Sequence, residues 1–159
     1  MKVFKFGGAS VKDAAGVQNL VLVLEKVGFK ETLIVVSAMG KTTNALEAII
    51  ETYFKNKKQT PKGILALKQF HLDVVKDLFR EESGEVETAI HQLFEELIAF
   101  FNTNKSPDYS FVYDQVVSYG ELLSTTIIHH FIQKKKIDSF WLDARNCIKT
   151  DDYYRSANL

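Results

Sequence analysis

The sequence predicts an α/β fold whose sheet is mainly parallel and whose chain makes a long helical excursion. Two observations support this. Two short strand-like segments, at residues 3–6 and 33–36, flank a segment with helical periodicity, and residues 60–104 then show helical periodicity almost without interruption. A length of 159 residues suits one compact domain.

The first 36 residues are predicted to form a strand–helix–strand unit. Residues 3–6 alternate apolar and polar side chains and stop at Gly7-Gly8, as a strand ending in a turn does. Residues 11–27 carry a helical apolar stripe, and Gly28 stands where a helix-ending glycine belongs. The continuous apolar run at 33–36 is typical of a strand that is buried on both faces of a parallel sheet.

The middle of the chain is predicted to be helical. Asn44 could cap a helix that runs to about Lys55, and Thr60-Pro61 is a helix-start signal with Thr as N-cap. Residues 60–104 then predict an αα-hairpin with one apolar stripe on each helix. Core packing is the favoured interpretation of these stripes, and subunit contact is the alternative.

One further helix and one further strand are expected toward the C-terminus. Ser106-Pro107 opens a helical stretch that ends in three lysines at 134–136, where cations suit a helix C-terminus. The run at 139–142 is predicted to be a third strand, leading into a loop at 143–145.

Composition excludes several classes of protein. Lys and Arg number 20 and Asp and Glu number 20, so no basic excess indicates a nucleic-acid partner. The single cysteine, Cys147, cannot form an intramolecular disulfide, which favours a reducing compartment, and a buried structural thiol is expected there. Neither a signal peptide nor a membrane-spanning run is apparent, so a cytoplasmic protein without a membrane partner is predicted.

Ligands of open parallel sheets bind in the loops beyond the carboxyl ends of the strands, and three such loops are expected at 7–10, 37–44 and 143–145. In the first loop, Gly7 and Gly8 let the backbone approach an anion, and the following helix N-terminus adds unpaired N–H groups. Lys5 upstream and Ser10 downstream complete a predicted phosphate site. Two glycines in an ordinary tight turn are the alternative.

The second loop carries Gly-Lys-Thr at 40–42 but is not a P-loop, because Val35 stands where the first glycine should be. What remains is a polar loop whose hydroxyls and amide could orient a small polar ligand. Ordinary helix capping by Thr43 or Asn44 is the alternative explanation.

A third candidate is Gly120-Glu121, within a predicted helix. Glycine inside a helix costs about 1 kcal/mol relative to alanine, so a close approach by another element or a ligand is expected there. Glu121 could then bind an ammonium group, although a solvated glutamate is equally compatible. No metal site is predicted, since the side chains of His129 and His130 point about 100° apart on a helix.

Three motifs in this order resemble the N-terminal part of aspartokinases, of the amino acid kinase family: KFGGAS at 5–10, VVSAMGKTTN at 35–44 and SYGELLS at 118–124. The segments at 143–145 and 149–151 are also similar. The resemblance implies a partial three-layer αβα sandwich of the amino acid kinase type over residues 1–159, with the helical excursion at about 60–104. It implies transfer of the ATP γ-phosphate to the β-carboxylate of L-aspartate, giving 4-phospho-L-aspartate for lysine and threonine biosynthesis.

The resemblance also implies roles for individual residues. Lys5 would stabilise the transferring phosphoryl group, while Gly7, Gly8 and Ser10 would contact the phosphates of ATP, which Mg²⁺ would accompany. The residues expected to hold aspartate are Ser37, Thr43 and Glu121, with Glu121 meeting the α-ammonium group.

Aspartokinases continue into a Gly- and Ser-rich segment that completes the site and into regulatory domains, and neither pattern occurs within residues 1–159. An N-terminal fragment that is inactive alone is therefore expected. An exposed sheet edge near Trp141 could be covered by a second copy in a homo-oligomer. The alternatives are a non-catalytic module for small-anion binding or assembly, and another kinase of the same family.

Overall fold

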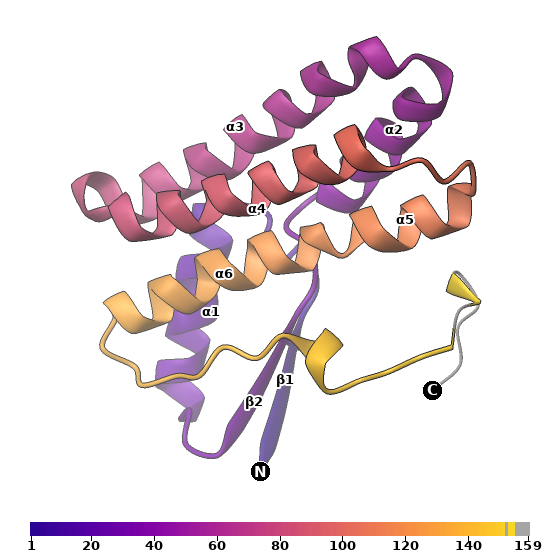
Figure 1. Ribbon diagram of the computed structural model, residues 1–159. Helices are drawn as coiled ribbons and strands as arrows, with labels where there is room; N and C mark the ends of the chain where they lie inside the picture. Colours follow the sequence, from indigo (N-terminus) through magenta and orange to yellow (C-terminus); the bar gives the residue numbers. More distant parts are fainter. Residues whose placement is uncertain (152, 155–159) are drawn as a thin grey trace.

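A computed structural model describes residues 1–151, 153 and 154, and Figure 1 shows it as two strands below a layer of long helices. The elements in chain order are β1 (Lys2–Phe6), α1 (Ala14–Val27), β2 (Thr32–Val36), α2 (Thr42–Lys55), η1 (Lys57–Gln59), α3 (Thr60–Phe79), η2 (Arg80–Glu82), α4 (Gly84–Thr103), α5 (Tyr109–Val117), α6 (Tyr119–Lys134) and η3 (Ala144–Asn146).

The predicted strand–helix–strand unit is present. Strands β1 and β2 pair in parallel, with Lys5 opposite Val35, and α1 connects them. The helix begins where the Asp13 carboxylate accepts a hydrogen bond from the Gly16 amide at 2.9 Å, and it ends at Gly28, whose φ is +79°. Both ends therefore use ordinary capping chemistry, although α1 starts three residues later than the periodicity predicted.

The two faces of this sheet have different surroundings. Phe4, Ile34 and Val36 pack against the helices, because alternate strand residues point to the same face. On the other face Leu33 and Val35 are each 44% exposed. The prediction that residues 33–36 are buried on both faces is therefore wrong for the part of the chain described, where helices cover one face only.

The helical hairpin forms as predicted. Helices α3 and α4 lie side by side across the top of the molecule in Figure 1, and their apolar stripes enter one core with α6. Phe94 and Leu97 of α4 are fully buried there, which confirms core packing as the role of this stripe. Within residues 1–151, 153 and 154, no helix is both long enough and apolar enough to cross a membrane.

The single helix expected after Pro107 is divided into α5 and α6, which meet at Ser118. The Asp108 carboxylate caps α5 by accepting the Ser110 amide at 2.8 Å. At the far end of α6, the Lys134 ammonium donates to the Phe79 carbonyl oxygen at 3.0 Å and ties this helix to the end of α3.

Residues 139–142 do not form the predicted third strand, and the expected sheet edge near Trp141 is absent with it. The segment runs back along α6, where the Trp141 indole donates to the Thr125 hydroxyl at 3.0 Å and Ser139 contacts His129 at 3.2 Å. Phe140 between them is 87% exposed. A strand needs ladder partners, and none of the described segments supplies one here.

Candidate functional site

The first two predicted loops meet at the carboxyl ends of β1 and β2. The Gly40 amide donates to the Gly8 carbonyl oxygen at 3.0 Å, and the Ser37 amide donates to Phe6 at the same distance. A Cβ atom on Gly8 would lie 2.5 Å from the Ala38 carbonyl oxygen, a contact that real side chains do not make. Gly8 is thus required for this joining of the two loops.

The third candidate segment, at the start of α6, packs against the same loop. The Glu121 Oε1 accepts the Ala38 amide at 3.2 Å, and the Ser124 hydroxyl donates to the Ser37 carbonyl oxygen at 2.9 Å. A Cβ atom on Gly120 would lie 2.8 Å from the Ala38 Cβ. The close approach predicted from Gly120 is therefore confirmed, and its partner is the loop that follows β2.

Several polar groups at this junction are not used by the protein itself. Ser10, Ser37 and Thr43 make no side-chain hydrogen bond with any described residue, and the ammonium of Lys5 makes no ion pair with one. Helix α2 has Lys41 at its N-cap position and no side-chain cap. Capping by Thr43 or Asn44 is therefore wrong, and these side chains stay available to a ligand.

The phosphate loop differs from its prediction in one respect. The chain turns between Gly7 and Ser10, whose amide donates to the Gly7 carbonyl oxygen at 2.9 Å, but α1 begins only at Ala14. At the N-terminus of that helix the Asp13 carboxylate accepts the Gly16 amide and brings a negative charge, which opposes the binding of a second anion there. Lys5 lies on the open face, one residue before the end of β1, and its ammonium adds positive charge near this loop.

The third predicted loop uses its charges internally. Arg145 forms a bidentate pair with Asp143, with Nη2 and Oδ2 2.7 Å apart, and this guanidinium holds the pKa of Asp143 below its usual value. Burial raises the pKa of Tyr119, and the negative charge of Glu96 raises it further, while the positive charge of Arg145 opposes the shift. Arg145 therefore acts electrostatically on the residue next to Gly120, although no strand brings it there.

One residue of this region was missed from the sequence. His71 of α3 is completely buried, and its Nε2 lies 3.4 Å from the hydroxyl of Thr42 at the start of α2. Burial lowers the pKa of His71 to about 4. Its place in an apolar helical stripe was visible in the sequence, but its partner 29 residues away was not.

Two other candidates from the sequence lie away from this junction. His129 and His130 are each bound through Nδ1, to Ser139 and to the Thr126 carbonyl oxygen respectively. Cys147 is an exposed free thiol, so the expectation of a buried structural cysteine is wrong. Among the residues that the structure describes, no three His, Cys, Asp or Glu side chains are grouped so that they could hold a metal ion.

The family of this chain follows from comparison with known proteins. The sequence model of the amino acid kinase family matches residues 1–158. The chain belongs to the amino acid kinase family. Its relatives within that family include aspartokinase 1 from Arabidopsis thaliana chloroplasts, 30% identical over 95% of this chain, and lysine-sensitive aspartokinase 3 from Escherichia coli, 24% identical over 98%. The aspartokinase of Chlamydia pneumoniae is 26% identical over 98% of the chain.

The fold is shared with a solved member of this family. The structure of E. coli aspartokinase III with lysine and aspartate superimposes with a TM-score of 0.87 over 99% of this chain, at 23% identity. The predicted fold class and the resemblance to the N-terminal part of aspartokinases are thereby confirmed. This chain spans only 34% of that structure, 33% of E. coli aspartokinase 3 and 27% of Arabidopsis aspartokinase 1.

Proposed function

We propose that this chain forms the aspartate-facing part and a portion of the phosphate site of an aspartokinase catalytic domain. The observation that carries the proposal is the position of Glu121, whose Oε1 is held by the amide of Ala38, the residue after Ser37. The adjacent Gly120 lies against Thr42, the residue before Thr43. A fixed carboxylate next to free hydroxyl donors complements an amino acid, which presents one ammonium and two carboxylate groups.

On the substrate side, Glu121 would bind the α-ammonium group of L-aspartate through its second carboxylate oxygen. The hydroxyls of Ser37 and Thr43 would donate to the substrate's carboxylate oxygens. The structure of E. coli aspartokinase III in complex with aspartate and ADP, which matches this chain at a TM-score of 0.86, supports aspartate and an adenine nucleotide as the ligands of the proposed site.

On the phosphate side, an oxygen of the aspartate β-carboxylate attacks the γ-phosphorus of ATP, and the bond from that phosphorus to the bridging β-phosphate oxygen breaks. The products are 4-phospho-L-aspartate and ADP, and the attacking carboxylate has no proton to lose. Catalysis then depends on positioning and on charge stabilisation. Lys5 would stabilise the negative charge, while Gly7, Gly8 and Ser10 would contact the phosphates.

Mg²⁺ is expected to enter with the nucleotide. The described residues offer no cluster of three or more carboxylate, imidazole or thiolate ligands for it. A cytoplasmic location belongs to the same proposal, because a lone exposed thiol at Cys147 suits a reducing compartment.

Turnover by this chain alone is not expected, since it spans about a third or less of the relatives that it matches. We predict that a coupled ADP-release assay with ATP, Mg²⁺ and L-aspartate detects no phosphorylation by the purified chain. Robust turnover would show that residues 1–159 contain a complete active site.

Binding of L-aspartate tests the proposed site directly. Titration calorimetry should detect L-aspartate binding, and Glu121→Gln should weaken it by about tenfold to a hundredfold, the effect of losing a charged hydrogen bond of about 1.5–3 kcal/mol. Glu25→Gln on α1 is the matched control and should leave the affinity unchanged. Absence of aspartate binding by the unmodified chain, or equal binding by Glu121→Gln, would contradict the proposal.

A further inference from the structure

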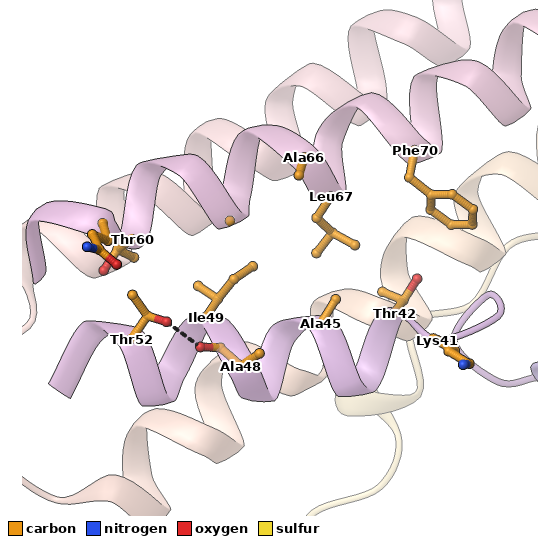
Figure 2. Close-up of a pocket in the computed structure, with 12 residues that line it drawn as sticks. Lys41, Thr42, Ala45, Ala48, Ile49, Thr52, Thr60, Ala66, Leu67 and Phe70 are labelled. Atoms are coloured by element: carbon orange, nitrogen blue, oxygen red, sulfur yellow. Dashed lines mark hydrogen bonds between the residues drawn. The ribbon is translucent and has the colours of Figure 1, made fainter. Parts of the chain in front are cut away.

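A partly open cavity of about 420 Å³ lies between α2 and α3. Figure 2 shows Ala45 and Ala48 of α2 facing this space from below, with Ala66 and Leu67 of α3 above. Ile49 of α2 and Leu67 of α3 line the cavity as well, and a Cβ atom on Gly63 of α3 would lie only 2.8 Å from Ile49 Cγ1, so the two helices touch beside it. Thr42 and Phe70 lie at the end of the cavity nearest the candidate site.

At that end the two helices are joined by a polar contact. His71 Nδ1 lies 2.9 Å from the Leu67 carbonyl oxygen of its own helix, which can only accept, so Nδ1 carries the proton. In the neutral ring, Nε2 is then the acceptor that faces the Thr42 hydroxyl at 3.4 Å. Burial favours this neutral form by lowering the pKa of His71 to about 4.

Thr42 is held from two other directions as well. Its amide donates to the Met39 carbonyl oxygen at 3.0 Å, and its Cγ2 lies so near Gly120 of α6 that a Cβ atom added there would be 3.4 Å away. The residue is almost fully buried. It therefore connects the loop after β2, the start of α6 and the helical hairpin, and it directly precedes Thr43.

We propose that His71 is a positioning residue for the aspartate site, acting through the hydroxyl of Thr42 to fix the first turn of α2. The inference rests on the proposed function and extends it by a residue that touches no substrate. The contrasting possibility is that His71 merely fills space, since its ring packs beside Phe70 and Phe94 at centroid distances of 5.0 and 5.9 Å.

Substitutions at Thr42, which leave the His71 ring in place, distinguish a positioning role of His71 from a space-filling role. Thr42→Val keeps the shape of the side chain but removes the hydroxyl, whereas Thr42→Ser keeps the hydroxyl. Thr52→Val is the matched control, because the Thr52 hydroxyl lines the same cavity but donates only to Ala48 of its own helix, at 2.8 Å. His71→Phe keeps an aromatic ring and removes both nitrogens.

We expect Thr42→Val to weaken L-aspartate binding about tenfold in calorimetry and to speed hydrogen exchange of the amides at residues 42–45. ATP binding should not change. Thr42→Ser and Thr52→Val should stay within about twofold of the unmodified chain. In a double-mutant cycle, adding His71→Phe to Thr42→Val should cost little more than Thr42→Val alone, since both changes remove one interaction.

Equal aspartate affinity and equal exchange rates in Thr42→Val and the unmodified chain would overturn the inference. If the unmodified chain binds no aspartate, the proposed function fails, and the positioning role falls with it. A His71→Phe chain that does not fold leaves the comparison of Thr42→Val with Thr42→Ser decisive.

Discussion

Gly7 and Gly8 stand side by side in the phosphate loop but have different surroundings. A Cβ atom on Gly7 would meet nothing within 4 Å, whereas one on Gly8 would lie 2.5 Å from the Ala38 carbonyl oxygen and 3.2 Å from that of Gly40. Backbone oxygens cannot rotate away as a side chain can. The structure itself therefore requires glycine at position 8, whereas a side chain at position 7 would meet no described residue.

We predict that Gly8→Ala lowers the free energy of unfolding by about 1–3 kcal/mol, the usual cost of forcing an extra carbon into a packed site. Gly7→Ala should leave stability unchanged or raise it by up to about 1 kcal/mol, because alanine restricts the unfolded chain. Urea unfolding of both variants checks this. Equal losses in the two variants would mean that the contact with Ala38 does not limit residue 8.

The pKa of His71 makes stability depend on pH. The folded chain binds a proton there only near pH 4, whereas the unfolded chain does so near 6.5, so the unfolded state binds more protons between these values. Stability is therefore fully present above about pH 6.5 and falls as the pH is lowered toward 4, by about 3 kcal/mol at most.

This prediction is tested by urea unfolding at pH 7 and pH 4.5. The unmodified chain should lose most of that stability on acidification, and His71→Phe should lose distinctly less. His91→Gln changes an exposed histidine on α4 and should behave like the unmodified chain. An identical pH dependence in all three chains would show that His71 is not the group responsible.

At the scale of elements, the helical hairpin stabilises the fold through one face of each helix. Phe94 is fully buried among core residues, while Ile98, one turn later on α4, is 39% exposed. Substitutions at these two residues therefore compare a core position with a partly exposed position on the same helix.

Phe94→Ala should lower the free energy of unfolding by about 3–5 kcal/mol, because it leaves a cavity in the core. Ile98→Ala should cost about 1 kcal/mol or less, since part of that side chain stays in water. Chemical denaturation of both variants is the measurement. A larger loss for Ile98→Ala would contradict the assignment of the buried stripe.

Elements that local chemistry determines could be predicted from the sequence, whereas elements that depend on a distant partner could not. The Gly28 helix end and the stripes of α3 and α4 are local signals, so these helices could be predicted. Residues 139–142 have strand-like composition, but they contact α6 through Trp141 and Ser139, and no ladder partner could be inferred from the sequence.

The candidate site shows the same division. Gly120 indicated a close approach because glycine is costly within a helix, and that approach is to Ala38. The hydrogen bond from Ser124 to Ser37 and the contact of His71 with Thr42 join residues 87 and 29 positions apart. No local pattern in the sequence indicates such distant pairs, so Ser124 and His71 were not predicted to belong to the site.

At the scale of the whole molecule, the open face of the sheet stands out. Strands β1 and β2 pair only with each other among the described residues, so each has one edge with unpaired backbone groups. Val3, Leu33 and Val35 expose 59%, 44% and 44% of their surface on this face. Apolar faces beside unpaired edges favour pairing with another chain.

We therefore predict that the purified chain associates with itself through this sheet, and not through the edge near Trp141 that the sequence suggested. Sedimentation velocity at increasing protein concentration should show a rising average mass. Leu33→Lys should shift the chain toward monomer, because a lysine on the open face makes pairing of two sheets unfavourable.

Leu65→Lys is the matched control. Leu65 is 66% exposed on α3, away from the sheet, and its replacement should leave association unchanged. Equal effects of the two substitutions would mean that association, if seen, uses another surface, and a constant monomer mass at all concentrations would show that the open face does not pair with a second copy.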